Sequence, residues 1–394
     1  MSGCGHDETI LAYHDCPVDM PRIHALVIGV GRYIEPRDSR KKPFSNLPGA
    51  ARAAIRFAKY LIDEFHDPEG RSLGTVRLLL SSLEDEDAEL GSLSSGGAST
   101  LEVSLALEAW GDDCHQNEKN LAILYVAGHG VALSRGINTL FLSDAMLWGS
   151  EYQGSLNLIS VDEGMAGCRA KDNIYVYDCC ALPPNEISEM ASIGGLYMKP
   201  FPQPGPREGL KKRDSVVYIN AARVGTSTYA IGLGGTLLSR GLLGDFREHT
   251  GDDALLLTAG EIVDNNYGIT TSRLKEALPT RLMELLEALK GDPRGYEPSV
   301  TGNRGPARAL TLPQPPPSYT VVLKGLHEGR DLPVSLVIQD GQGAVLREEP
   351  NAPDEYSTDL EAGEYFAFVA GAGATGFKGQ TLRVEGSRSW QVVG

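Results

Sequence analysis

The chain of 394 residues is predicted to form a doubly wound, mostly parallel α/β sheet flanked by helices, followed by a small C-terminal β-sandwich. Three observations predict this fold class. Short runs of branched apolar residues recur through the first 220 positions, and helical patterns separate them. The last stretch, about 75 residues long, shows the two-residue alternation that is typical of half-buried strands.

Five apolar runs are the predicted strands of the central sheet. They are mainly apolar on both faces, as expected for parallel strands that helices cover on both sides. They occupy residues 25–30, 76–80, 121–126, 174–177 and 216–219. In this architecture, functional residues are expected at the carboxyl ends of the strands.

Helical spacing of apolar residues connects these runs. Residues 47–65 place small and aromatic side chains three and four positions apart, which predicts a helix that packs on the sheet. Shorter helices are predicted at 100–110 and 160–168. A longer one is predicted at 274–290, with an interruption at Pro279 because proline cannot donate a helical hydrogen bond.

The composition changes towards the C-terminus and divides the chain. Residues 303–318 are rich in proline, which favours an extended, semi-rigid connection. We therefore expect an N-terminal extension (1–21), a main α/β domain (22–312), a linker (313–318) and a β-sandwich (319–394).

Charge and composition exclude several classes of protein. A formal net charge of -16 argues against nucleic-acid binding, which needs clustered basic residues. No apolar run approaches the ~18 residues of a membrane span, and the N-terminus has no secretory pattern. Six scattered cysteines are unlike the dense framework of a small secreted domain, so reduced thiols in a cytoplasmic protein are expected.

Two of the predicted strands end in residues that can do chemistry. His129 follows one strand and lies between two glycines, whereas Asp178, Cys179 and Cys180 end the next strand. Both groups are therefore expected at the same edge of the sheet. A cysteine nucleophile needs a base close by, because the thiolate attacks a carbonyl and the thiol does not.

These residues lie in a series of blocks that resembles the caspase-like cysteine peptidases, which include caspases, metacaspases and paracaspases. His129 and Cys180 are 51 positions apart, close to the separation of about 50 in caspases. The resemblance covers residues 22–312 and implies a prokaryotic-type caspase-like peptidase domain. The blocks that carry it are ALVIGVGRY, LPGAARAAIRFAKYL, YVAGHG, TLFLSDA, YVYDCCAL, YINAARVG and GLGGTLLSRGLLGDF.

The resemblance implies a role for each site residue. Cys180, the third residue of the D-x-C motif, would be the nucleophile and His129 its base, with Cys179 structural. The backbone N–H groups of Gly130 and Cys180 would stabilise the oxyanion, and a thioester acyl-enzyme would be hydrolysed by water. No metal or cofactor is expected, and dependence on calcium stays open.

The resemblance implies that Asp178 lines the pocket for the substrate residue before the cut. A negative charge in that pocket favours substrates with Arg or Lys at this position. The chain departs from the family here, because Arg52-Ala53 replaces an Asn-Asp pair that adds acidity in many members. Other acids could take that place: Asp162, Glu163 or Asp172.

A basic loop follows the predicted cysteine strand. Residues 199–213 contain five basic residues and one acid, a pattern that solvated surface also explains. In caspase-like zymogens a linker lies at this place, and its cleavage can allow the active-site loops to rearrange. The resemblance therefore implies activation by self-cleavage or by an upstream protease. The candidate processing sites are Arg207, Lys211, Lys212 and Arg213.

Three functions are compatible with the sequence. The first is an active endopeptidase that cleaves proteins or peptides, and the resemblance implies a bacterial stress or defence context for it. The second is a catalytically weak scaffold that binds regulatory partners through the sandwich, although the intact Cys/His pair argues against it. The third, a hydrolase or acyl-transferase of small molecules, ranks last because the sequence contains no phosphate or cofactor cradle.

Overall fold

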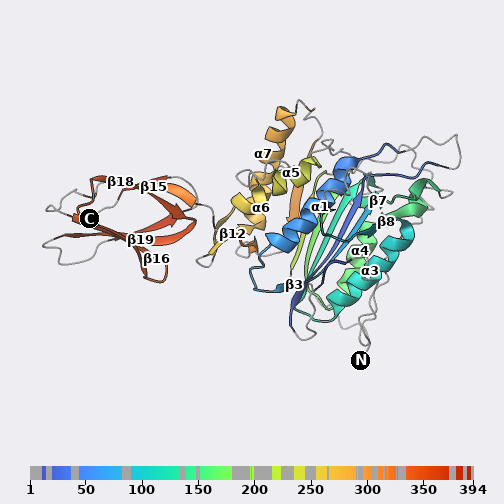
Figure 1. The fold of residues 1–394 in the computed structure, drawn as a ribbon, viewed down its shortest axis with the longest axis horizontal. Coiled ribbons are helices and arrows are strands. Elements are labelled where there is room, and N and C mark those ends of the chain that lie inside the picture. Colours follow the sequence, from blue (N-terminus) through green and yellow to red (C-terminus); the bar gives the residue numbers. More distant parts are fainter. Residues whose placement is uncertain are drawn as a thin grey trace.

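The structure is a computed structural model with a larger α/β body and a smaller β body at the C-terminal end (Figure 1). It describes residues 11–14, 20–36, 44–81, 90–132, 138–147, 151–179, 196, 198, 215–222, 235–244, 254–263, 266–289, 291, 296–302, 309–313, 316, 318–324, 326, 334–371, 379–384 and 388–391.

A central sheet forms the middle layer of the α/β body, and within the described residues it has eight strands. Six of these strands run parallel, the short β4 among them, and the two edge strands β1 and β13 are antiparallel to their neighbours. The order across the sheet is β1 (Leu11–His14), β3 (Ser72–Ser81), β2 (Arg22–Val30), β5 (Leu121–Gly128), β9 (Asp172–Cys179), β10 (Ser215–Asn220) and β13 (Ser299–Gly302), and β4 (Gly96–Gly97) also pairs with β3. The five apolar runs form the other parallel strands, so the predicted doubly wound, mostly parallel sheet is confirmed.

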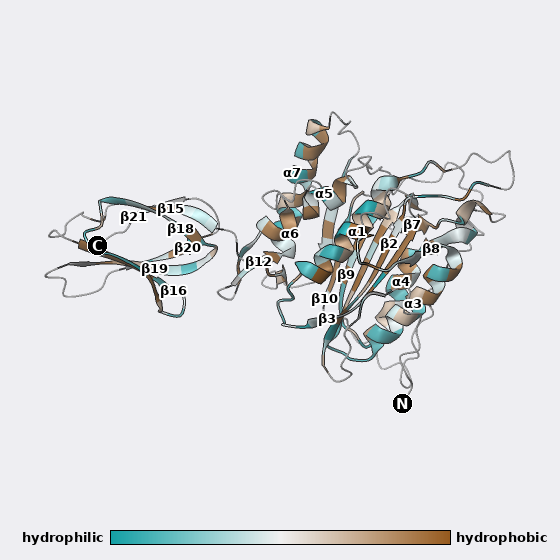
Figure 2. Ribbon diagram, in the orientation of Figure 1, coloured by the Kyte–Doolittle hydropathy of each residue, from teal (hydrophilic) through white to brown (hydrophobic). Residues whose placement is uncertain are grey.

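Helices cover both faces of this sheet (Figure 1). On β5, Ile123 and Tyr125 pack into one core, whereas Leu124 and Val126 pack into the other, which explains the continuous apolar run in the sequence. In Figure 2 the strands in the middle of the central sheet are accordingly coloured largely as hydrophobic. The first core contains side chains of α1 (Pro48–Asp63), α5 (Leu237–Leu243), α6 (Leu255–Thr258) and α7 (Thr271–Ala288), and the second those of α3 (Thr100–His115) and α4 (Leu158–Ala166). In the part of the chain that the structure describes, no helix has both the length and the apolar composition needed to cross a bilayer.

Helix α7 corrects one prediction. Pro279 lies inside this continuous helix, so the predicted interruption is wrong. Leu274, Leu278 and Leu282, on either side of the proline, are all buried in the first core. Their packing compensates for the one helical hydrogen bond that proline cannot make, since tertiary packing supplies most of a helix's stability.

The C-terminal body consists of two mainly antiparallel sheets around a core of their own. Val321 of one sheet and Leu336 of the other both belong to this core. Arg383 also donates a hydrogen bond to the Ile262 carbonyl, which joins this body to the α/β body. One sheet contains β15 (Ser318–Lys324), β18 (Glu355–Glu361) and β21 (Arg388–Gln391), and the other β16 (Val334–Asp340), β17 (Val345–Glu349), β19 (Gly363–Gly371) and β20 (Gly379–Val384). The exact domain boundaries stay predictions.

Two further small sheets lie in the α/β body. The sheet that follows β5 begins next to His129 and fixes the backbone there. It contains β6 (Gly130–Ala132), β7 (Asn138–Phe141) and β8 (Ser155–Asn157). The other contains β11 (Glu261–Val263), β12 (Asn266–Thr270) and β14 (Ala309–Thr311), and two short 3-10 helices, η2 (Ala145–Leu147) and η3 (Glu151–Gly154), complete the described elements.

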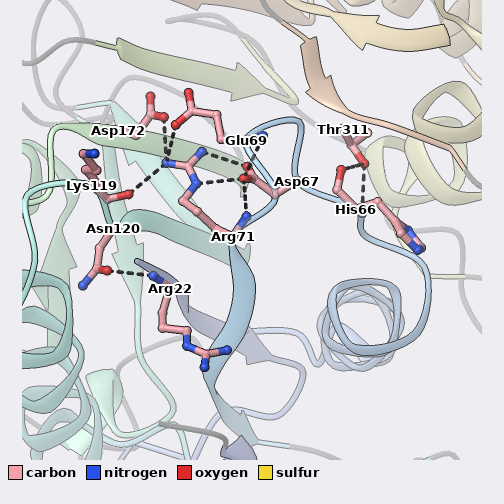
Figure 3. Close-up of polar contacts among 9 residues, drawn as sticks. All are labelled: Arg22, His66, Asp67, Glu69, Arg71, Lys119, Asn120, Asp172 and Thr311. Carbon is pink, nitrogen blue, oxygen red and sulfur yellow. Dashed lines mark hydrogen bonds and ion pairs between the residues drawn. The ribbon is translucent and has the colours of Figure 1, made fainter. Parts of the chain in front are cut away.

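A buried charge cluster joins the amino ends of the strands (Figure 3). The Arg71 guanidinium donates to both carboxylate oxygens of Asp67, at 2.9 and 2.8 Å, and to Oδ2 of Asp172 at 2.9 Å. It also donates to the Lys119 carbonyl at 3.2 Å. Because Arg71 and both carboxylates are buried, one cation holds the starts of β3 and β9 together with the loop before β5.

Replacing Arg71 by methionine is expected to lower the free energy of unfolding by about 3–5 kcal/mol, because Asp67 and Asp172 would stay buried without their cation. Urea denaturation measures the change. Arg273→Met is the matched control, since the Arg273–Glu276 pair is largely exposed, and its effect should stay within about 0.5 kcal/mol. Equal effects of the two substitutions would contradict this account of the cluster.

Candidate active site

The parallel pairing of β5 with β9 brings the sequence-predicted residues to one edge of the sheet. Ala127 is opposite Asp178, and Gly128 is opposite Cys179 in the last rung of this ladder. Neighbouring strands lie about 4.8 Å apart, so Gly128 lies beside Cys179, and His129 is the next residue along the chain. Cys180, the predicted nucleophile, lies outside the described residues, and the chain reaches it directly from Cys179.

The His129 ring is held by a backbone carbonyl. Its Nε2 atom lies 2.9 Å from the Ser45 carbonyl oxygen and 3.3 Å from the Ser45 hydroxyl. Since a carbonyl oxygen can only accept, Nε2 carries the proton, and a neutral His129 keeps its lone pair on Nδ1. Burial lowers the pKa of His129 below its usual value, and the hydrogen bond to Ser45 opposes this shift. At neutral pH the ring is therefore a base with Nδ1 as the accepting atom.

Aromatic side chains surround this imidazole. The ring of His129 packs against Tyr33 and Phe44, with centroid distances of 5.1 and 5.4 Å. Phe44 packs in turn on Phe141 at 4.9 Å. These contacts remove water from part of the ring, which is the physical cause of the lowered pKa.

The backbone after His129 is oriented by the sheet of β6 and β7. The His129 carbonyl accepts a hydrogen bond from the Phe141 amide at 2.9 Å, and Gly130 is opposite Leu140. Antiparallel pairs alternate between hydrogen-bonded and non-hydrogen-bonded positions, so Gly130 occupies a non-hydrogen-bonded one. Its N–H therefore faces away from β7, as a donor to a bound oxyanion must.

Gly128 is required by the crowding at this edge. Its φ of 155° is one that side chains rarely adopt. A Cβ atom there would also lie 3.1 Å from Val30, the Tyr33 hydroxyl and Leu140. The residue before His129 must therefore be a glycine for the strand to end in this geometry.

Asp178 lies buried on the face of the sheet that α1 and α5 cover, with 1% of its surface exposed. The Tyr125 hydroxyl donates to its Oδ2 atom at 2.7 Å, and the Thr236 hydroxyl donates to the same oxygen. Among the described residues, Oδ1 has no hydrogen-bond partner. Burial raises the pKa of Asp178 to about 6, and the two hydroxyl groups oppose this shift.

The alternative acids lie elsewhere. Asp172 is at the amino end of β9 and binds Arg71, so it cannot line a pocket at the carboxyl end. Asp162 and Glu163 belong to α4, which packs on the opposite face from Asp178, and Asp162 accepts a hydrogen bond from Tyr218 at 2.8 Å.

Two neighbours of the predicted site are buried. Cys179 is 3% exposed and packs with Tyr177 in the second core, in agreement with a structural thiol. Arg52, the first residue of the Arg52-Ala53 pair, is buried in α1. The predicted processing loop 199–213 lies outside the described residues, as do the candidate sites Arg207, Lys211, Lys212 and Arg213.

Three partners of the site were missed by sequence reasoning. Ser45 acts through its backbone carbonyl, which no side-chain pattern can indicate. Tyr125 lies in the middle of a run that reads only as a buried strand, and Thr236 is a helix N-cap far along the chain. Across the described residues, no group of three His, Cys, Asp or Glu side chains is arranged to hold a metal ion.

Comparisons with known proteins add a structural neighbour. No protein-family model matches the chain, and no curated protein matches it by sequence. The crystal structure of protein GSU0716 from Geobacter sulfurreducens is similar with a TM-score of 0.42 and 13% sequence identity, over 75% of this chain and 100% of that chain.

The raised pKa of Asp178 predicts a pH-dependent stability. The folded state binds this proton more tightly than the unfolded state, so stability should fall by about 2 kcal/mol as the pH rises from 4 to 7, a range that covers most of the interval between the unfolded and the folded pKa. Urea denaturation across this range measures the loss.

Two variants separate Asp178 from other titrating groups. Asp178→Asn should abolish this part of the pH dependence, and Tyr125→Phe should move the transition to higher pH because a hydrogen bond to the charged form is lost. An Asp178→Asn protein with the wild-type pH dependence would contradict the assignment.

Proposed function

We propose that the protein is a caspase-like cysteine endopeptidase in which Cys180 is the nucleophile and His129 its base. The observation that carries the proposal is the last rung of the β5–β9 ladder. Gly128 and Cys179 are paired there, and the next residue of each strand is one member of the catalytic pair. The hydrogen bond from His129 Nε2 to the Ser45 carbonyl also supports the proposal, because it leaves Nδ1 unprotonated and free to act as the base.

The reaction follows from these groups. Nδ1 of His129 takes the thiol proton, and the Cys180 sulfur attacks the scissile carbonyl carbon. The N–H groups of Gly130 and Cys180 donate to the oxyanion that forms. When the C–N bond breaks, the imidazolium returns the proton to the leaving amine. Water then hydrolyses the thioester, releases the acid and restores the thiol.

Cleavage after Arg or Lys is the second part of the proposal. The hydroxyl groups of Tyr125 and Thr236 both donate to Oδ2 of Asp178. Oδ1 is therefore a buried acceptor to which a guanidinium or ammonium group of the substrate would donate a hydrogen bond. A bound cation would also favour the charged carboxylate and lower its pKa. Cleavage within residues 199–213 as the activating step belongs to the same proposal.

A peptide panel tests the nucleophile and the pocket. Peptides that differ only in the residue before the cut (Arg, Lys, Asp or Leu) are incubated with the wild type, Cys180→Ala and the matched control Cys179→Ala. We expect turnover of the Arg and Lys peptides by the wild type and Cys179→Ala, and a loss of at least about a thousandfold in Cys180→Ala. Turnover that survives in Cys180→Ala would rule out the nucleophile, and a preference for Asp would rule out the pocket.

The pH dependence of KM tests Asp178 alone. An Arg peptide needs the charged carboxylate, so its KM should rise about tenfold per pH unit below pH 6. The isosteric citrulline peptide carries no charge, and its KM should stay nearly constant over the same range. Identical KM profiles for the two peptides would show that Asp178 does not recognise the basic side chain.

A further inference from the structure

Tyr33 contacts the backbone of the proposed base. Its hydroxyl accepts a hydrogen bond from the His129 amide at 2.8 Å. Across the same residue, the His129 carbonyl accepts from the Phe141 amide. Both backbone groups of His129 are therefore bound, and the position of its Cα is fixed from two sides.

Tyr33 also contacts the segment that carries the acceptor of the imidazole. Its own amide donates to Oδ1 of Asn46 at 3.2 Å, and its ring packs edge-on against Phe44 at 5.2 Å. Ser45, whose carbonyl binds Nε2 of His129, lies between these two residues. One tyrosine thus joins the base to the segment that selects its tautomer.

The ring and the hydroxyl of Tyr33 have separable roles. Tyr33 is 5% exposed and its ring packs on His129, so a phenylalanine would keep this packing. Only the hydroxyl binds the His129 amide, so phenylalanine would leave this donor without its acceptor, which costs free energy in the present backbone position. A backbone shift that relieved this cost would displace the imidazole from the Ser45 carbonyl.

We propose that Tyr33 is a positioning residue whose hydroxyl holds His129 on the Ser45 carbonyl, so that Nε2 keeps the proton and Nδ1 is the base. The inference rests on the proposed function for its catalytic consequence. The effect on the tautomer of His129 is independent of that function.

The test is Tyr33→Phe, examined by imidazole nitrogen NMR and by peptide kinetics. In the wild type, His129 should be the single Nε2–H tautomer, and in Tyr33→Phe a mixture of both tautomers. The kcat of Tyr33→Phe should fall about ten- to a hundredfold with KM changed less than about twofold, because a small misplacement of the base slows the chemistry and leaves substrate binding intact.

Two further variants keep the test decisive. Asn46→Ala, at an exposed position, removes the acceptor of the Tyr33 amide and so loosens the link between Tyr33 and the segment that carries Ser45. It should therefore also give a mixture of His129 tautomers, and it keeps the test open if Tyr33→Phe folds poorly. Tyr365→Phe removes a hydroxyl that binds the Glu361 carbonyl in the C-terminal body, and it should match the wild type. An unchanged tautomer in Tyr33→Phe would overturn the inference, whatever its kcat. A wild type that cleaves no peptide would instead count against the proposed function, and the NMR result would still decide the role of Tyr33.

Discussion

The pairing of two parallel strands, β5 and β9, is the constraint on which the rest of the site depends. Their register sets Gly128 beside Cys179 and Ala127 beside Asp178. A shift of one residue would move every side chain of β9 to the other face of the sheet. Asp178 would then leave the hydroxyl groups of Tyr125 and Thr236, and Cys179 would leave the second core. The burial of both faces of β5 and β9 therefore fixes which residues lie beside one another at their carboxyl ends.

The buried carboxylates at the two ends of β9 have different partners. At the amino end, Asp172 shares the Arg71 guanidinium with Asp67, and this cluster stabilises the fold. At the carboxyl end, Asp178 is also buried, but the partners of its side chain within the described residues are hydroxyl groups alone, and Oδ1 has none there. A buried carboxylate without a cation costs stability, which its raised pKa reflects. Strongly shifted pKa values of this kind cluster at functional sites.

Much of the fold could be predicted from the sequence, because strands buried on both faces produce continuous apolar runs. The interruption at Pro279 was wrong since packing of the surrounding leucines outweighs one lost hydrogen bond. The placement of His129 and Asp178 at one edge of the sheet could be predicted, because each lies at the carboxyl end of an apolar run. Their partners could not be predicted, because Ser45 acts through its backbone and Thr236 reaches Asp178 across 58 positions of sequence. Contacts of this kind exist only once the sheet has formed.

The central claim is that His129 activates the thiol of Cys180. The most direct measurement is the rate of alkylation of each cysteine by iodoacetamide as a function of pH, mapped by peptide mass spectrometry, in the wild type and in His129→Ala. We expect Cys180 to react fast at neutral pH and buried Cys179 to be protected. In His129→Ala, the pH at which alkylation of Cys180 becomes fast should move towards the usual thiol pKa of about 8.5. A Cys180 profile that is the same in both proteins would contradict the central claim.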